Sequence, residues 1–305
     1  DLTPTHVHTV FGDSSWSKTS GGAEAFTQLI RNELIPYVES KYPVSTYRTL
    51  VGHSLGGLYT VNTLAHHPDL FANYLAIDPS MWWDDRKLSH ATTSLFTPGS
   101  LSNKALFVAV ANTMEKEMDI ERIHTDTSSS SEHIRSILEF NKNTESNTAS
   151  VLNFEWKYYG DYDHGSVPFI SEYDALRYFF RWYKMDTDDL YPDEPTLTAD
   201  EVLEKISNHS NVLSEKFGYE VPPDEGLINQ LGYFYMGKNK GDDAYTLFKY
   251  NVDHYPESAN VFDSVGDYWL WKGDTTKAIQ SFEQALKVEP LDYTRDKLMK
   301  LKEGK

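Results

Sequence analysis

The sequence contains no cysteine, no long apolar run and no block of basic residues. Without cysteine there are no disulfides, no thiol nucleophile and no thiolate metal site, and both the cytoplasm and the periplasm stay compatible with the chain. No run approaches the roughly 18 apolar residues of a membrane span. The 28 basic residues stand against 46 acidic ones, a net charge of −18. This balance argues against nucleic acid or an anionic membrane as a partner.

The 305 residues exceed one average domain, and a hydrophobic content of 39% is enough for a sizeable core. Strand candidates alternate with helical segments and lie at 49–52, 74–77, 105–111 and 154–159. This alternation predicts an α/β class protein with a mostly parallel sheet covered on both faces. An acidic stretch with two prolines at 186–195 marks a change in composition. We therefore predict an α/β domain at 1–185, a linker at 186–198 and an all-helical domain at 199–305.

The helical domain repeats with a period of 34 residues. The matched pairs are Leu231/Val265, Gly232/Gly266, Tyr235/Trp269, Ala244/Ala278, Phe248/Phe282 and Pro256/Pro290. Small residues where two helices cross, and proline after the second helix, resemble the tetratricopeptide repeat. We predict two such repeats at about 226–257 and 260–291, with the segments 199–216 and 293–301 packed against them or capping them.

The pattern G-x-S-x-G occurs within TLVGHSLGGLY at 49–59. A short β-compatible run precedes it, and apolar residues at spacings of three and four follow it, so the context is strand, turn and helix. This is the context of a nucleophile elbow, in which Gly52 and Gly56 would remove side chains where strand and helix nearly touch. We predict Ser54 as the nucleophile and the backbone N–H of Leu55 as one oxyanion donor.

A serine hydroxyl needs a neighbouring base, and a histidine after the last strand fits that role. His164 lies in DYDHGS at 161–166, after the strand candidate 154–159 and before a final amphipathic helix. It also follows Ser54 in the chain order of the α/β-hydrolases. We predict His164 as the general base. His53, although adjacent to Ser54, is interpreted as a packing residue that the turn directs away.

The acid that orients His164 is open. The loop after 105–111 offers Glu115, Glu117 and Asp119. Of these we favour Glu115, although a solvated charged loop explains them nearly as well. Asp84 or Asp85 are alternatives from the neighbouring strand end, and a Ser–His dyad without any acid is another.

Two adjacent indoles, Trp82 and Trp83, follow a strand candidate. They would form an apolar wall for an acyl or aryl group, which predicts a substrate pocket there. Packing in the core explains tryptophan equally well, so both interpretations are kept.

Six segments, DLTPT, GGAEAF, ELIPYVESKY, RTLVGHSLGGLY, PDLFANYLAIDPSMWW and DHGSV, follow one another between the first residue and about residue 183. In this order they resemble the bacterial putative-esterase family of α/β-hydrolases, which contains the enterochelin esterases and the periplasmic esterase that trims salmochelin. The resemblance implies Ser54 as nucleophile and His164 as base, and it associates Trp82 and Trp83 with the substrate side.

The resemblance also implies what lies outside this chain. In the family, DLTP follows an early strand, so the first strands and the second oxyanion donor are expected to precede the first residue here. Asp78 stands where many members have serine, and some members work with a Ser–His dyad. The resemblance therefore leaves the acid open as well.

We expect a serine esterase that acts on a small-molecule ester through an acyl-enzyme and needs no metal or organic cofactor. A different hypothesis is an interaction protein whose helical repeats bind a protein or peptide partner, with the hydrolase domain as scaffold. An acyltransferase or a peptidase would use the same acyl-enzyme. The repeats are not shared by the siderophore esterases, which weakens a siderophore assignment.

Overall fold

The computed structural model describes residues 2–10, 12–96, 101–148 and 152–303. The chain forms two compact units, Asp1–Arg181 and Trp182–Lys305. Their boundary lies close to residue 185, where the α/β domain was predicted to end. Within the described ranges, no helix combines the length and the apolar character needed to cross a bilayer.

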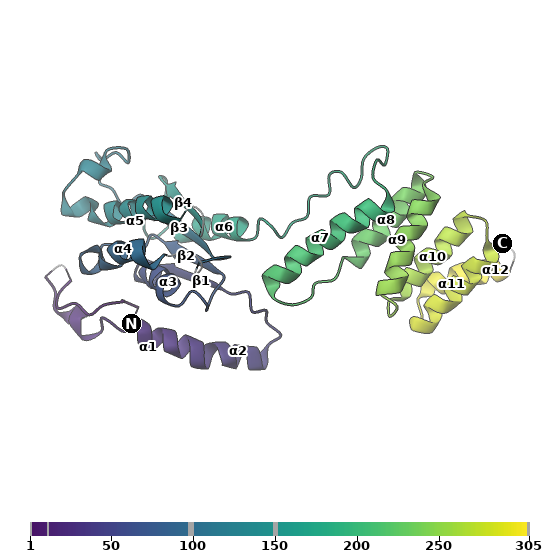
Figure 1. Ribbon diagram of the computed structural model, residues 1–305, viewed down its shortest axis with the longest axis horizontal. Helices are drawn as coiled ribbons and strands as arrows, with labels where there is room; N and C mark the ends of the chain where they lie inside the picture. The colour runs from purple at the N-terminus through teal and green to yellow at the C-terminus, as the bar shows by residue number, and fades with distance from the viewer. Residues whose placement is uncertain (1, 11, 97–100, 149–151, 304–305) are drawn as a thin grey trace. The chain divides into compact units, whose positions relative to one another are not determined.

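The first unit is built on a parallel sheet with the strand order β1-β2-β3-β4 (Figure 1). Its strands are β1 (Thr49–His53), β2 (Asn73–Ile77), β3 (Ala105–Ala111) and β4 (Asn153–Tyr159). Each agrees with its predicted range to within one residue at either end. The register pairs His53 with Ile77 and Ile77 with Ala109. Residues that follow these strands therefore meet at one edge of the sheet.

Before the first strand the chain forms a helix in three parts, namely α1 (Ala23–Leu29), the π-helical η2 (Ile30–Leu34) and α2 (Ile35–Lys41). Pro36 lies in the first turn of α2. Proline has no N–H to donate to the preceding turn, and the wider π-helical turn lies directly before α2. The remaining helices are η1 (Ser15–Lys18), α3 (Leu55–His66), α4 (Trp83–Leu95), η3 (Ile123–Thr125), η4 (Ser129–Ser131), α5 (Glu132–Thr148) and α6 (Val167–Phe179).

Side chains of β2 and β3 alternate between two hydrophobic clusters, as the period of two in a strand requires. Those in the cluster with α3, α4 and α5 are Tyr74, Ala76, Leu106, Val108 and Val110. Those in the cluster with α6 are Leu75, Ile77, Ala105, Phe107, Ala109 and Ala111. The two central strands are thus buried on both faces, as predicted. In the edge strand β1, by contrast, Val51 is 46% exposed.

The second unit is helical, with α7 (Ala199–Phe217), α8 (Glu225–Gly237), α9 (Gly241–His254), α10 (Ala259–Trp271), α11 (Thr275–Val288) and α12 (Asp292–Lys302). Residues 186–198, predicted as a linker, are all described and contain turns and bends but no helix or strand. Leu190 within this segment is fully buried in the core of the helical unit. The segment therefore packs on the helices that follow it.

Two glycines 34 residues apart have the same surroundings in the helical unit. A Cβ added at Gly232 would lie 2.6 Å from the ring of Phe248, and one added at Gly266 would lie 2.4 Å from the ring of Phe282. The hairpins α8–α9 and α10–α11 are therefore closed by the same contact. The flanking segments expected to pack against them form α7 and α12, and Leu298 of α12 joins Phe282 in a small cluster.

Candidate active site

Ser54 occupies the turn between β1 and α3, with φ 59° and ψ −117°. Residues other than glycine rarely adopt such a backbone. Its N–H donates to the carbonyl of Ile77, and its own carbonyl accepts from the N–H groups of Leu58 and Ser80, each at 3.0 Å. Bonds to α3 and to the end of β2 therefore hold this strained residue between strand and helix, in the context that the sequence predicted.

The close approach of β1 and α3 depends on Gly52, where an added Cβ would lie 2.0 Å from the carbonyl oxygen of Gly56. The prediction that Gly56 also removes a collision is wrong, because the nearest atom to a Cβ there is Cδ1 of Leu2, at 3.9 Å. The second close approach is at Gly57, where a Cβ would lie 2.9 Å from Pro79. Helix α3 therefore approaches the segment after β2 most closely at Gly57, one residue after the predicted Gly56.

Asp78 follows β2 directly and its side chain is fully buried. Its Oδ1 accepts from the N–H of Ala111 at 2.9 Å, and its Oδ2 accepts from His164 Nδ1 at 2.6 Å and from His133 Nε2 at 2.8 Å. Burial favours the neutral form of the carboxyl, but the bonds from the two histidines outweigh it and hold the pKa of Asp78 well below its usual range. Asp78 is an ionised carboxylate shared between two imidazoles.

His164 lies on the loop between β4 and α6. Its hydrogen bond to Asp78 raises the pKa of the imidazole, against partial burial that lowers it. A carboxylate oxygen of Asp78 only accepts, so Nδ1 carries the proton and Nε2 is left as the basic nitrogen. This is the protonation pattern that a general base requires.

His53 is not directed away from the site, as its place beside the turn suggested. Its ring lies against that of His164, with the centroids 4.3 Å apart and an angle of 40° between the planes. Burial, followed by the charge of His164, lowers the pKa of His53. His53 is therefore a neutral packing partner of the predicted base.

Two neighbouring residues, Ser80 and His53, link Ser54 to Asp78 and His164. The Oγ of Ser54 lies 3.4 Å from Oγ of Ser80, two residues beyond Asp78. Its neighbour His53 packs on His164. Within the described residues, Ser54 and His164 do not hydrogen-bond to each other in this structure. The ends of β1, β2 and β4 nevertheless bring the serine, the carboxylate and the histidine to the same edge of the sheet.

The structure pairs His164 with Asp78 instead of Glu115. Glu115 is exposed on the loop after β3. Asp84 and Asp85, the other candidates, lie with Arg86 in a short left-handed turn, with φ values of 48°, 51° and 59°. The sequence did place Asp78 directly after a core strand, next to the strand of the elbow. That position is a signal for Asp78, but it does not rank Asp78 above the acids at other strand ends.

His133 is a part of the site that the sequence did not reveal. It lies in the first turn of α5, and its Nδ1 accepts from the indole N–H of Trp82 at 3.0 Å. Its other nitrogen bonds to Asp78, 55 residues earlier in the chain. No local motif surrounds His133, so only the tertiary structure shows its role.

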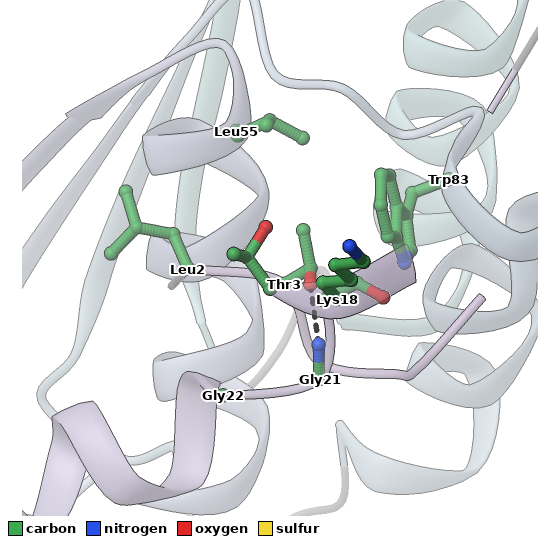
Figure 2. A pocket seen from close by; sticks show the side chains of 9 residues that line it. Leu2, Thr3, Lys18, Gly21, Gly22, Leu55 and Trp83 are labelled. Atoms are coloured by element: carbon green, nitrogen blue, oxygen red, sulfur yellow. Dashed lines mark hydrogen bonds between the residues drawn. The ribbon is translucent and has the colours of Figure 1, made fainter. Parts of the chain in front are cut away.

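The two tryptophans border two neighbouring cavities, and Trp83 lines both of them. The first, about 670 Å³, is lined by Leu2, Thr3, residues 18–22, Leu55 and Trp83. Figure 2 shows the side chains of Leu55, Leu2 and Trp83 around it. Trp83 is also buried and donates from Nε1 to Oγ1 of Thr5 at 3.1 Å, so it serves both core and pocket. Trp82 lines the second hollow, about 410 Å³, together with His6 and His8.

Asp78, His133 and His164 also have the composition of a metal site, because one ligand atom from each lies within 4.8 Å of the others. The tautomers oppose that use. An indole N–H only donates, so Nδ1 of His133 accepts and Nε2 must carry its proton. The nitrogens that face Asp78 thus hold protons in place of lone pairs, and in this arrangement they have no lone pair to offer a metal ion.

A family model described as "Putative esterase" matches residues 7–171, more than half of the chain. The chain belongs to this family. Three curated relatives are named as esterases, two of them as siderophore esterases. They are the ferri-bacillibactin esterase BesA of Bacillus subtilis (34% identical over 92 residues, 30% of this chain and 32% of the relative), the siderophore enterobactin esterase of Emericella nidulans (31% over 183 residues, 55% and 60%) and the siderophore triacetylfusarinine C esterase of Aspergillus fumigatus (40% over 72 residues, 23% and 25%).

The chain spans between 25% and 60% of the length of these relatives. Among solved structures, it resembles an IroE-like serine hydrolase from Shewanella oneidensis, with 28% identity, a TM-score of 0.59 and coverage of 81% of this chain and 73% of the other. It shares its fold with an uncharacterised protein from Capnocytophaga ochracea, with 16% identity, a TM-score of 0.62 and coverage of 92% and 75%. The α/β architecture of this esterase family is therefore the architecture of the first unit.

Proposed function

We propose that the protein is a serine esterase in which Ser54 is the nucleophile, His164 the general base and Asp78 the acid that orients the base. One observation carries the proposal. The 2.6 Å hydrogen bond from His164 to buried Asp78 lies at the same sheet edge as the strained turn of Ser54. Membership of the esterase family supports it.

In the proposed reaction, Nε2 of His164 takes the proton of the Ser54 hydroxyl as Oγ bonds to the ester carbonyl carbon. The carbonyl oxygen becomes an oxyanion, and the backbone N–H of Leu55 at the start of α3 is the proposed donor to it. His164 then gives its proton to the leaving alcohol and the acyl-enzyme forms. Water, activated by the same nitrogen, releases the acid and restores Ser54.

The hollow beside Leu55 is the proposed place for the substrate. Trp83 and Leu2 give it apolar walls, and Thr3 and Lys18 add polar groups, so it suits an ester with both apolar and polar parts. The names of two of the relatives make siderophore esters the first class to test.

The helical unit supports a second, compatible proposal. We infer that α8–α11 are two repeats of the tetratricopeptide type, because Gly232 and Gly266 make the same contact with Phe248 and Phe282. Such repeats bind peptides along a concave face, so a protein or peptide partner is the proposed role of this unit. Binding there and ester hydrolysis in the first unit do not exclude each other.

The esterase proposal is tested with a fluorophosphonate probe and p-nitrophenyl acetate. We expect the wild-type chain to be labelled at Ser54 and to hydrolyse the ester. Ser54→Ala should abolish labelling and lower kcat by about a thousandfold or more. Ser281→Ala, which removes an exposed hydroxyl in the helical unit, is the matched control and should retain both. Equal hydrolysis by wild type and Ser54→Ala would refute the proposal.

A further inference from the structure

His133 is hydrogen-bonded to Asp78, the proposed acid of the catalytic group. Its Nε2 lies 2.8 Å from Oδ2 of Asp78, the same oxygen that accepts from His164. The rings of His133 and His164 are 5.3 Å apart and nearly perpendicular, at 89°. The arrangement therefore places two imidazole N–H groups on one carboxylate oxygen from two directions.

Trp82 fixes how His133 is protonated. An indole N–H has no acceptor function, so the 3.0 Å bond requires Nδ1 of His133 to be the acceptor. The remaining nitrogen, Nε2, then carries the hydrogen and can only donate to Asp78. The order of donors is Trp82 to His133 to Asp78, and His133 serves as a neutral relay of hydrogen bonds.

The residues after Trp82 form a turn that connects α4 to α5, the helix that carries His133. Asp84, Asp85 and Arg86 all have positive φ, a left-handed conformation that is unfavourable for residues other than glycine. The turn brings the Arg86 guanidinium to Glu132, with contacts at 2.8 and 2.9 Å, and also to Glu139. Glu132 precedes His133 on α5, so these ion pairs join α4 to α5 beside the relay. The strained turn is thus tied to the element that carries His133.

We propose that His133, with its tautomer fixed by Trp82, is a positioning residue that holds the Asp78 carboxylate for His164. The proposal rests on the proposed function of Ser54, Asp78 and His164. A buried carboxylate with two N–H donors on one oxygen and Ala111 on the other cannot rotate without losing a bond. His164 therefore meets its partner in a single orientation.

Because His133 and His164 share the Asp78 carboxylate, removing one of them should change the pKa of the other. The groups that face His164 are Asp78 after β2, His53 at the end of β1, His133 on α5 and Asp163 on its own loop. The N–H of His133 partly offsets the negative charge of Asp78, so that charge stabilises the His164 imidazolium less. Removing the donor should raise the pKa of His164, so that the base is protonated up to a higher pH.

Two substitutions of His133 distinguish the effect of its hydrogen bonds from the effect of its size. His133→Gln can accept from Trp82 with its amide oxygen and donate to Asp78 with its amide nitrogen, whereas His133→Leu can do neither. We expect His133→Leu to lower kcat for p-nitrophenyl acetate by about tenfold, with KM changed by less than about twofold. The acid limb of its pH profile should move to higher pH. His133→Gln should stay within about threefold of wild type on the same scale.

The proposal is overturned if folded His133→Leu has the kcat and the pH profile of wild type. It is also overturned if His133→Gln is as impaired as His133→Leu, because the hydrogen bonds would then not be the cause. Circular dichroism and thermal unfolding establish that each variant is folded. A purely structural role would lower stability without moving the acid limb.

A second measurement does not depend on esterase activity or on a folded leucine variant. In wild-type protein with 15N-labelled histidine, long-range proton–nitrogen spectra should show His133 with its proton on Nε2. Trp82→Phe removes the indole donor, so the Nδ1 resonance should shift, while the bond to Asp78 keeps the proton on Nε2. A wild-type His133 protonated on Nδ1 refutes the relay. If Ser54→Ala leaves hydrolysis unchanged while His133 shows the expected tautomer, the esterase proposal fails and the relay stands.

Discussion

Nδ1 of His164 lies 2.6 Å from Oδ2 of Asp78, a residue 86 positions earlier in the chain. The contact is possible because β2 and β4 are parallel strands of one sheet, so the residues that follow them meet at the same edge. It assigns the donor and the acceptor without ambiguity, since a carboxylate only accepts. The pair therefore fixes which nitrogen of His164 is left to act on Ser54.

The identity of the acid is tested by a pair of substitutions. Asp78→Asn removes the charge and allows the wrong tautomer of His164, so kcat should fall by up to about ten-thousandfold, as in other serine triads. Glu115→Gln changes an exposed carboxylate on the loop after β3 and should alter kcat by less than about twofold. Steady-state kinetics with p-nitrophenyl acetate gives both values. A large loss with Glu115→Gln and none with Asp78→Asn would restore the acid first predicted from the sequence.

The pH dependence follows from the direction of the shift at His164. Its bond to Asp78 raises the pKa above the ordinary histidine value of about 6.5. The base acts only when Nε2 is unprotonated, so activity should be present at higher pH and be lost as the pH falls through this raised pKa. The rate of inactivation by a fluorophosphonate, followed against pH, measures the acid limb. In Asp78→Asn the limb should move to lower pH, and a limb below pH 6 in wild type would contradict the assignment.

The fold was largely readable from the sequence because its signals are local. The strands β2 and β3 are apolar on both faces, and a helical stripe follows each turn, so the order of elements was visible without tertiary information. Ser54 and His164 sit in motifs of a few residues with recognisable flanks. The contact between Gly232 and Phe248 was likewise signalled by its repetition 34 residues later.

The remainder of the site depends on contacts between distant segments. His133 lies on the first turn of a helix with no motif around it, and its bond to Asp78 spans 55 residues. Asp78 itself was visible at a strand end, but nothing local ranks one strand end above another. The role of Gly57 depends on where Pro79 passes α3, which a pattern of glycines does not specify.

The glycines of the elbow give a prediction for stability. Gly52→Ala would place a Cβ 2.0 Å from the carbonyl oxygen of Gly56, which forces the backbone to move, so the free energy of unfolding should fall by about 3 kcal/mol or more. Gly56→Ala meets only Leu2, at 3.9 Å, and should be neutral or stabilise by up to about 1 kcal/mol. Thermal and urea unfolding compare the two. Equal losses would mean that the approach of β1 and α3 is not the reason for Gly52.

Two glycine substitutions in the helical unit give a second prediction for stability. Gly232→Ala would press a Cβ against the ring of Phe248 at 2.6 Å and should cost about 1–3 kcal/mol of unfolding free energy. Gly237→Ala, at the end of the same helix, has no heavy atom within 4 Å of the added Cβ and should be neutral or slightly stabilising. Urea unfolding of the full chain, followed by circular dichroism, measures both. Gly266→Ala should match Gly232→Ala, because it makes the equivalent contact with Phe282.

The three possible metal ligands give the last prediction. If Nε2 of His133 and Nδ1 of His164 carry protons toward Asp78, as their partners require, then a chelator has no ion to remove there. Dialysis against EDTA should leave kcat and the thermal midpoint unchanged, and metal analysis should find no stoichiometric zinc or iron. Added zinc would have to displace both protons, so any inhibition by it should weaken as the pH falls. Loss of activity on chelation, restored by one metal ion per chain, would show that Asp78, His133 and His164 bind a metal ion and do not form a hydrogen-bonded relay.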